Sequence, residues 1–463
     1  MNYELLAQEY FEREDIKKQA IADLSEIIAV NSVASSPEEG FPFGRECARA
    51  LDVATGIAVK YGFEVINHDY RCLSVLFGEG DYEVGIVTHL DIVPATDGWE
   101  TDPFTLTDKG GLLIGRGAHD DKGPFIQSLY TIRFFKENNI KLPFRVRLIL
   151  GSDEEVGSSD LAYFQTVCRA PWFSFTPDSE YPVCIGEKGI AGVNVNVGKL
   201  PVCIRELSGG TVANAVPFEA HAEVVTESEL CGNEAVTLEK TEQGYIVTAH
   251  GKPAHAAMPE QGVNAIGLLA SYLLENRLCE GNERGFEFLA SACSEYLGKT
   301  LGIGCDNPDF GYLTCVGGVI GVRDGNIVQN FNIRYTPEFN GKTLFEAICI
   351  AVGDYGLDAE LVSASEGYFV SADDDRIRAL TTACESVLGI PCEPYTMGGG
   401  TYARSLPNTV AFGSGIVSER TRLGEGRGGP HQRDEYISHT EFFGGMNIFV
   451  RSLLNLSSVN PTA

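Results

Sequence analysis

The chain has 463 residues, of which 64 are acidic and 35 are basic, so its formal net charge at pH 7 is −29. So acidic a surface repels phosphate groups, which argues against nucleic acids and anionic membranes as partners. Hydrophobic residues make up 44% and charged residues 21%, which is typical of a folded protein, and the length suits two domains. No apolar run is long enough to span a membrane, and the first residues lack the features of a secretory signal.

Residues 1–30 have the pattern of an amphipathic helix, and residues 45–61 have that of a second one. Two short segments rich in β-branched residues, 83–90 and 144–150, predict buried strands, with a helix over 125–138 between them. Strand, helix and strand with short connections indicate a mainly parallel sheet flanked by helices.

The middle of the chain alternates between apolar and polar residues, which is typical of antiparallel strands. Strand-like segments cover 191–197, 220–226, 244–250, 317–333 and 357–370, with helical stretches at 262–276 and 343–356. A mixed pattern returns after about residue 374, with a helix over 376–388 and a last one near the C-terminus. We therefore expect an α/β domain, residues 1–188 and 372–463, into which an α+β domain with an antiparallel sheet, residues 189–371, is inserted.

Thirteen cysteines are scattered along the chain, and no Cys-x-x-Cys pair occurs. A disulfide framework or a structural zinc knot would need paired spacings. We interpret the cysteines as reduced thiols, most of them in the core, and we expect a cytoplasmic protein.

The first charged motif, Thr88-His89-Leu90-Asp91, stands at the end of a predicted strand. Ligands of open α/β sheets bind beyond the carboxyl ends of the strands. His89 and Asp91 point the same way on an extended chain, so the histidine could bind a metal while the aspartate holds its other ring nitrogen. Taken alone, the motif is more typical of a capped turn after a strand.

Two further motifs are rich in carboxylates. Asp120 and Asp121 stand in Gly115–Gly123, just before a predicted helix whose N-terminal amides favour negative charge. Glu154 and Glu155 follow the strand over 144–150, and one could bind a metal while the other takes a proton from metal-bound water. A helix cap and an exposed turn are the alternatives for these two segments.

Asp178, in Thr176-Pro177-Asp178, and His431, in Pro430-His431-Gln432, are weak signals when each is taken alone. The joint order is more informative, because His, Asp, Glu, Asp and His occur at strand ends or in loops of a parallel-sheet pattern. Nitrogen and oxygen donors in this number suit a co-catalytic pair of zinc ions.

Six segments together resemble the zinc metallopeptidase family of aminoacylases, glutamate carboxypeptidases and cytosolic dipeptidases. They read HLDIVP, GRGAHDDKG, GSDEEVG, TPDSEYP, GKPAHAAMP and HQRDEY. Within this family the chain is most similar to the PepV-type bacterial dipeptidases, on Pro42-Phe43-Gly44, Asn332-Ile333-Arg334-Tyr335 and the segment 397–404.

The resemblance implies two zinc ions per chain, with manganese or cobalt as substitutes. Its metal ligands would be His89 and Asp178 on one ion, Glu155 and His431 on the other, and Asp120 between them. Asp91 would orient His89, Glu154 would be the general base, and His255 would stabilise the oxyanion from the inserted domain. Asn214, Arg334, Gly399 and Gly400 match the groups that bind the substrate carbonyl and its terminal carboxylate.

Three positions depart from the family pattern. His119 replaces a small or apolar residue, Asn332 replaces an aspartate, and the segment 424–430 before His431 has an extra basic residue. Each could change metal loading or specificity, but none removes a ligand.

The resemblance implies hydrolysis of dipeptides, with a small peptide as the substrate. The main alternative is an N-acyl-amino-acid deacylase or desuccinylase with the same metals, and a non-catalytic peptide-binding protein is the other. The large insert favours the dipeptidase, because dimeric relatives have smaller lids and borrow the lid histidine from a partner. We therefore expect a monomer, with a dimer left open, and hinges near Gly186–Gly189 and Ser371–Asp374.

Overall fold

The computed structural model of the chain describes residues 2–424 and 426–461. These fall into two compact units. The first unit comprises the chain up to residue 185 together with 370–395 and everything from 400 onward, and the second comprises 186–369 and 396–399. The domain limits that the sequence suggests, at 188/189 and 371/372, stay predictions of where independently folding domains begin.

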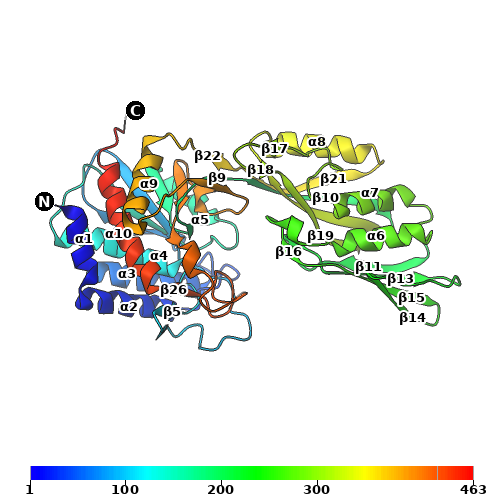
Figure 1. Cartoon of the computed structure of the whole chain (residues 1–463), viewed down its shortest axis with the longest axis horizontal. Coiled ribbons are helices and arrows are strands. Elements are labelled where there is room, and N and C mark those ends of the chain that lie inside the picture. Colours follow the sequence, from blue (N-terminus) through cyan, green and yellow to red (C-terminus); the bar gives the residue numbers. More distant parts are fainter. Residues whose placement is uncertain (1, 425, 462–463) are drawn as a thin grey trace. The chain divides into compact units, whose positions relative to one another are not determined.

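The first unit is built on a mixed sheet with helices packed around it (Figure 1). The strands of this sheet follow the order β1-β2-β6-β3-β7-β24-β9. Their bounds are Glu64–His68, Cys72–Phe77, Arg145–Gly151, Glu83–His89, Phe173–Thr176, Thr409–Phe412 and Val183–Glu187. The four central strands, β6, β3, β7 and β24, run parallel. β2 and β9, on either side of them, are antiparallel to their central neighbours, and β1 is antiparallel to β2. The predicted parallel core is thereby confirmed.

Helices flank this sheet. They are α1 (Tyr3–Glu12), α2 (Glu14–Ile28), α3 (Arg45–Lys60), α4 (Lys122–Glu137), α5 (Ser159–Val167), α9 (Asp375–Leu388) and α10 (His439–Leu456). Short strands complete the unit: β4 (Thr107–Lys109), β5 (Leu112–Ile114) and β26 (Tyr436–Ser438) form one sheet, β8 (Ser179–Glu180) pairs with β25 (Ser414–Gly415), and β23 (Tyr395–Met397) pairs with β9. In the described part of the chain, no helix is both long enough and apolar enough to cross a bilayer.

The single helix predicted over residues 1–30 is wrong, because α1 and α2 are separate. The break falls at Arg13, whose backbone is extended with φ −64° and ψ 128°. Its guanidinium binds Asp15 at 2.6 Å. Glu14 and Asp15 occupy the first turn of α2, where the free amides of a helix N-terminus favour acidic side chains. The chain therefore starts a new helix there, although the apolar pattern continues.

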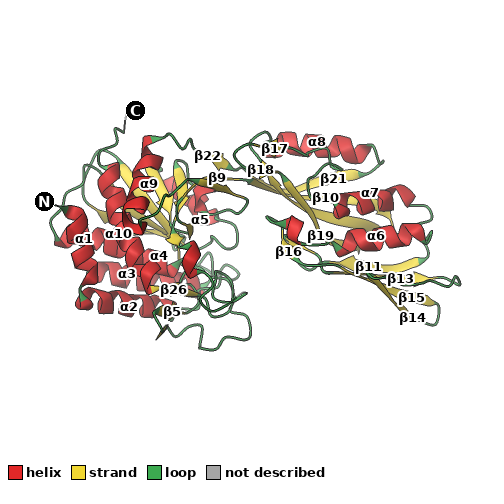
Figure 2. Cartoon of the chain, viewed as in Figure 1, coloured by secondary structure: helices red, strands yellow, loops and turns green. Residues whose placement is uncertain are grey.

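The second unit contains an antiparallel sheet, as the sequence predicts (Figure 2). Its eight strands follow the order β14-β15-β13-β11-β19-β20-β10-β21. The bounds in that order are Val236–Lys240, Gly244–His250, Glu219–Val225, Ile204–Gly209, Thr314–Arg323, Asn326–Tyr335, Gly189–Lys199 and Asp358–Ser365. Short strands form further pairs: β12 (Ala215–Val216) with β16 (Ala254–His255), β17 (Asp306–Asn307) with β18 (Gly311–Tyr312), and β22 (Tyr368–Phe369) with residues 186–187. The segment 317–333 is two strands, joined by a turn at Asp324 and Gly325, both with positive φ.

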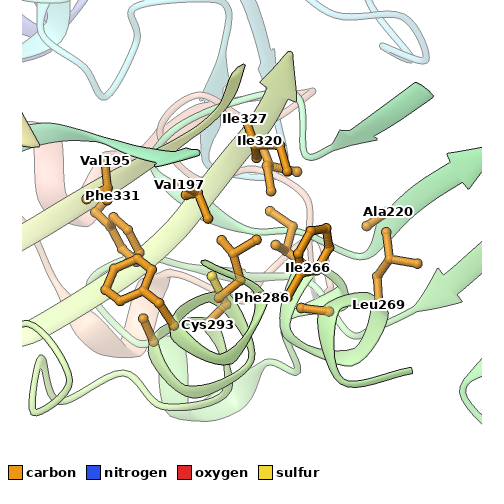
Figure 3. Packing of buried hydrophobic residues seen from close by; sticks show 14 of the residues in the cluster. Val195, Val197, Ala220, Ile266, Leu269, Phe286, Cys293, Ile320, Ile327 and Phe331 are labelled. Carbon is orange, nitrogen blue, oxygen red and sulfur yellow. The ribbon is translucent and has the colours of Figure 1, made fainter. Parts of the chain in front are cut away.

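Three helices pack on this sheet: α6 (Ala265–Glu275), α7 (Glu283–Ser294) and α8 (Gly341–Gly353). Alternate residues of β10, such as Val195 and Val197, are fully buried, which is what a strand covered on one face requires. Figure 3 shows these two valines and Phe286 of α7 in the apolar core of the unit, with Val195 beside Phe331. A continuous core of this kind gives the second unit its own source of stability.

Candidate metal centre

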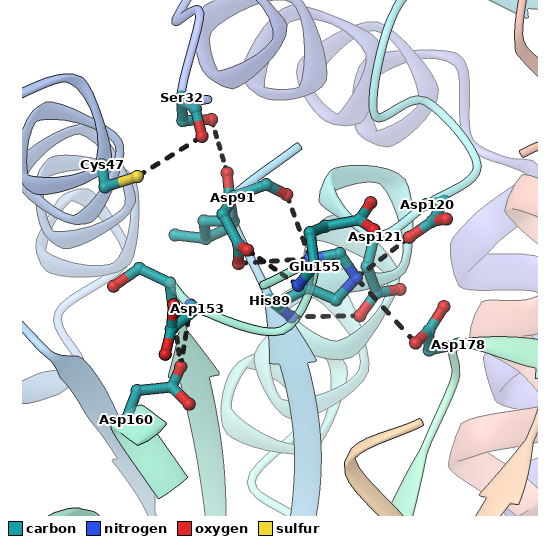
Figure 4. Close-up of polar contacts among 12 residues, drawn as sticks. Ser32, Cys47, His89, Asp91, Asp120, Asp121, Asp153, Glu155, Asp160 and Asp178 are labelled. Carbon is teal, nitrogen blue, oxygen red and sulfur yellow. Dashed lines mark hydrogen bonds and ion pairs between the residues drawn. The ribbon is translucent and has the colours of Figure 1, made fainter. Parts of the chain in front are cut away.

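The charged motifs of the first unit meet because parallel strands end at the same edge of a sheet. His89 is the last residue of β3, whose neighbours in the sheet are β6 and β7. Glu154 and Glu155 follow β6, and Asp178 follows β7. The loop before α4 brings Asp120 to the same edge, and Figure 4 shows Asp120, Glu155 and Asp178 around the His89 ring.

Asp120 lies between the two histidines. Its Oδ1 is 2.9 Å from His89 Nε2, and its Oδ2 is 3.1 Å from His431 Nε2. His431 Nε2 is also 3.1 Å from Glu155 Oε1, and His89 Nε2 is 3.9 Å from Asp178 Oδ2. The structure therefore brings together all five side chains that the sequence suggests as metal ligands.

Two groups of three side chains have ligand atoms within 4.8 Å of one another. One group is His89, Glu154 and Asp178, and the other is His89, Asp120 and Glu155. Glu154 belongs to the first group and Glu155 to the second. The distances among these atoms alone therefore do not decide which glutamate binds a metal and which acts as the base.

The donor set fits a divalent metal such as zinc, which takes imidazole nitrogen and carboxylate oxygen. His89 is fully buried, and its Nε2 has no hydrogen-bond partner among the residues that the structure describes. This holds although Asp120 Oδ1 is only 2.9 Å away, so the two atoms are close without the alignment of a hydrogen bond. A buried imidazole nitrogen close to a carboxylate oxygen but not hydrogen-bonded to it is suited to bind a metal.

The carboxylates of the cluster raise the pKa of both histidines. Hydrogen bonds to Asp120 and Glu155 raise the pKa of His431 to about 10. Burial lowers the pKa of His89, but the carboxylates of Asp120 and Asp91 outweigh that effect and hold it well above the usual value. Surroundings that favour positive charge on both histidines are also suited to a cation.

The carboxylates respond to burial and to one another. Burial raises the pKa of Glu154 to about 8, and the charges of Glu155 and Asp120 act in the same direction. Burial and the charge of Asp120 also hold the pKa of Asp178 well above its usual range. Carboxylates that repel one another at so short a range are stabilised by a cation placed among them.

Asp91 contacts two of the candidate ligands. His89 Nδ1 is 3.0 Å from the backbone oxygen of Asp91 and 3.4 Å from its Oδ1. The other carboxylate oxygen of Asp91 accepts a hydrogen bond from Glu155 N at 3.0 Å. The residue expected to orient His89 therefore also anchors the backbone of Glu155.

Three more buried acids hold the backbone around the candidate ligands by hydrogen bonds. Two of them, Asp160 and Glu435, had no role in the sequence analysis. Asp121 Oδ2 accepts a hydrogen bond from His89 N at 3.2 Å. Asp160 accepts hydrogen bonds from Ser152 N and Asp153 N, at 2.7 and 3.1 Å, in the turn that leads to Glu154. Glu435 binds the backbone of the Asp120 loop. Glu435 stands inside the HQRDEY motif, directly before a short strand. Its place in this motif is the feature of the sequence that could have indicated a role for it.

The expected substrate-binding residues Asn214, His255 and Arg334 belong to the second unit. Asn214 O accepts a hydrogen bond from Ala256 N at 2.9 Å, so it lies beside His255. Thr314 Oγ1 donates to Ala256 O at 3.0 Å, and Thr314 is paired with Arg334 across β19 and β20. A short series of contacts thus links all three residues.

Arg334 Nε donates to Asn332 Oδ1 at 3.0 Å, and its Nη1 lies 3.3 Å from Gly398 O. Gly399 belongs to the same unit, whereas Gly400 belongs to the first one. The side-chain amide of Asn332, one of the three positions that depart from the family pattern, therefore binds Arg334 directly.

His119 lies 3.9 Å from Glu441 Oε1 through its Nε2. Neither group of converging ligand atoms found among the described residues includes it. The extra basic residue before His431, Arg427, binds Asp434 at 2.8 Å and Glu100 at 2.7 Å. Glu425 in the same segment lies outside the described residues.

Comparison with known proteins finds a relative that is similar over nearly the full length of both chains. The Bacillus subtilis (strain 168) protein named "Putative dipeptidase YtjP" is 30% identical over 467 residues, which cover 95% of this chain and 98% of the relative. Among solved structures, human carnosine dipeptidase 1 has a TM-score of 0.60 at 16% identity, covering 98% of this chain and 99% of its own. Aminoacylhistidine dipeptidase from Vibrio alginolyticus has a TM-score of 0.58 at 14% identity, covering 94% and 96%.

Identities as low as those of the two solved structures show the fold alone, an α/β unit combined with a unit of antiparallel sheet. The family itself is shown by its own model, that of peptidase family M20/M25/M40, which matches residues 85–455. That range contains every expected metal ligand, and it confirms the resemblance seen in the sequence. The chain therefore belongs to peptidase family M20/M25/M40.

Proposed function

We propose that this protein is a metal-dependent dipeptidase of the PepV type. The observation that carries the proposal is the position of Asp120, with one carboxylate oxygen near His89 and the other near His431. The near full-length relative named as a dipeptidase supports the substrate class.

We assign two divalent cations to the site, zinc first, with manganese or cobalt as substitutes. His89 and Asp178 would hold one cation and Glu155 and His431 the other, with Asp120 shared. Such a pair activates a water molecule and polarises the scissile carbonyl when it is bound. The chain's own contribution is to hold these donors at a buried edge of the sheet, where Asp91 fixes both His89 and Glu155.

Glu154 is the general base in this proposal. Its carboxylate accepts a proton from the attacking water and returns it to the leaving amine as the C–N bond breaks. The adjacent Glu155 points to His431 and Asp120 instead, which supports different roles for the two glutamates. A positioned base of this kind contributes about 10²–10⁴-fold to the rate.

The second unit supplies the substrate contacts. The guanidinium of Arg334 offers paired donors that suit a terminal carboxylate, which favours short free peptides over long chains. Asn214 would bind the substrate carbonyl, His255 would donate to the developing oxyanion, and Gly399 and Gly400 would present backbone amides. The contacts that link Asn214, His255 and Arg334 within one unit support a joint role.

We further propose a cytoplasmic monomer. All thirteen cysteines of the chain are reduced in the structure, which supports a reducing compartment. The large size of the second unit, which includes residues 186–369, supports a lid that supplies His255 within one chain.

A substrate panel tests the proposal. Free dipeptides, N-acetyl and N-succinyl amino acids, and longer peptides are assayed by released amine, with metal content measured on the same sample. The proposal predicts turnover of dipeptides with little hydrolysis of acyl amino acids. Preference for an acyl amino acid would replace the dipeptidase with a deacylase, and metal binding without any turnover would point to a peptide-binding protein.

A further inference from the structure

Glu435 holds the loop that carries Asp120. Its Oε1 accepts hydrogen bonds from two consecutive backbone amides, His119 N at 2.9 Å and Asp120 N at 3.0 Å. Its backbone oxygen accepts a third one from Gly115 N, also at 2.9 Å. The Glu435 side chain is fully buried, so these bonds are shielded from water. Both ends of the Asp120 loop are therefore bound to this one residue.

Arg116 neutralises Glu435 from within the same loop. Its Nη1 is 2.5 Å from Glu435 Oε2, and its side chain is 1% exposed. The guanidinium also lies over the ring of Trp99, 5.2 Å from the centroid. Burying an ionised carboxylate without a partner charge would raise the free energy of the folded state. Loss of either Arg116 or Glu435 would therefore leave an unpaired buried charge.

The same residue is connected to His431. Glu435 stands four positions after His431, and the intervening Asp434 binds Arg427 at 2.8 Å and Glu100 N at 2.7 Å. Tyr436, the next residue, begins β26 and pairs with Ile114 of β5, directly before the Asp120 loop. Glu435 is thus the point at which the segments of two candidate metal ligands, Asp120 and His431, are joined.

We propose that Glu435 and Arg116 form a positioning pair that sets the geometry of Asp120 relative to His431, and thereby the affinity of the site for its metal. The inference rests on the metal site proposed above. Partners that fix the orientation of metal ligands typically change metal affinity by about 10- to 100-fold when they are mutated.

The molecule offers a matched control in the ion pair of Glu83 and Arg147. Arg147 binds Glu83 through two nitrogens, at 2.7 and 2.8 Å, and its side chain is 10% exposed. Glu83 begins β3 and His89 ends it, so this pair lies about 20 Å from the cluster at 3.3 Å per residue. Its loss should lower stability and leave the metal site unchanged.

The test compares E435Q and R116K with E83Q and R147K. Two quantities are measured for each: the unfolding temperature of the metal-free protein, and zinc affinity by competition with a chromophoric chelator. In E435Q an oxygen still faces the two amides, but an NH₂ group faces Arg116. R116K keeps the charge and loses the fixed direction of the guanidinium. We expect about 10- to 100-fold weaker zinc binding in both, and wild-type affinity in E83Q and R147K.

Wild-type zinc affinity in folded E435Q and R116K would overturn the inference. Glu435 and Arg116 would then be an ion pair that stabilises the fold without affecting the metal site. D120N separates this failure from failure of the proposed site, because only a wrong site leaves zinc binding unchanged in D120N. If E435Q and R116K do not fold, hydrogen exchange of the wild-type, metal-free protein decides. Slow exchange in residues 115–121 supports a loop positioned before metal binding, and exchange as fast as in an exposed loop contradicts it.

Discussion

Oδ1 of Asp120 lies 2.9 Å from Nε2 of His89. The second oxygen of the same carboxylate is 3.1 Å from His431, a residue that reaches the site from the far end of the chain. Cations bound at the two histidines would share Asp120. Substitution of this residue should therefore affect metal binding more than substitution of any other candidate ligand.

The bridging position predicts unequal effects of two neighbouring substitutions. D120N should lose most bound zinc, because the amide cannot serve two cations as a charged bridge. D121N is the matched control, since Asp121 accepts a hydrogen bond from His89 N and belongs to neither group of converging ligands found among the described residues. Zinc content after desalting is the measurement. Equal losses in the two variants would show that Asp120 is not the bridge.

The two adjacent glutamates should differ in what they lose. E154Q is expected to keep its zinc and its KM while kcat falls by about 10²-fold or more, because only proton transfer is removed. E155Q should instead lose zinc, since Glu155 lies 3.1 Å from His431. Kinetics and metal analysis on both variants check this. Zinc loss in E154Q with zinc retained in E155Q would exchange the two roles.

Asp160 predicts a pH-dependent stability. Burial raises its pKa from 3.8 to about 7, although hydrogen bonds from Tyr402 and backbone amides oppose the shift. The folded state therefore holds this proton more tightly than the unfolded state, so the stabilisation is complete below about pH 4 and is lost as the pH rises through 7. At roughly 1.4 kcal/mol per pKa unit, the loss is about 4 kcal/mol at most.

D160N mimics the protonated form and should lack this dependence. Urea unfolding of the metal-free proteins between pH 4 and 8 gives the comparison, in which wild type should weaken relative to D160N as pH rises. A constant difference would mean that Asp160 is already ionised in the fold and is stabilised by the amides of Ser152 and Asp153.

His255 should affect turnover without affecting metal. H255A is expected to lower kcat by about 10²–10³-fold, the usual effect of losing an oxyanion donor, with unchanged zinc content. H250A is the control, because His250 ends β15 and its ring nitrogen bonds Thr237 Oγ1 at 2.8 Å. Mixing E154Q with H255A adds a test of assembly. A self-contained chain gives no recovery, whereas recovery near the statistical fraction of mixed dimers would show that subunits share the site.

His89 and Glu155 could be predicted from the sequence as candidate ligands because each stands at or just after the end of a recognisable strand. His89 ends a run of β-branched residues, and the glutamates follow another, so a parallel arrangement is enough to bring them to one edge. The resemblance supplied His431, which no periodicity marks. Its backbone has φ +62°, in a loop held by the Arg427–Asp434 contact rather than by a regular element.

Other features depend on contacts that span the chain and leave no local pattern. Glu435 reads as a polar residue before a short strand, yet its carboxylate is buried against amides about 315 positions earlier. The strand β1, Glu-Val-Ile-Asn-His, is mostly exposed and polar at the sheet edge, so its alternation is weak. Arg13 interrupts the first helix where the apolar spacing continues, because acidic residues favour a new N-terminus.

Titration of the metal-free enzyme with zinc, read by hydrolysis of a free dipeptide, tests the central claim most directly. The account predicts no turnover without metal, activity that rises with added zinc and reaches a plateau at two equivalents per chain, and no such activity in D120N. Full dipeptide turnover by the metal-free protein, or none with zinc, manganese or cobalt in a correctly folded sample, would contradict it.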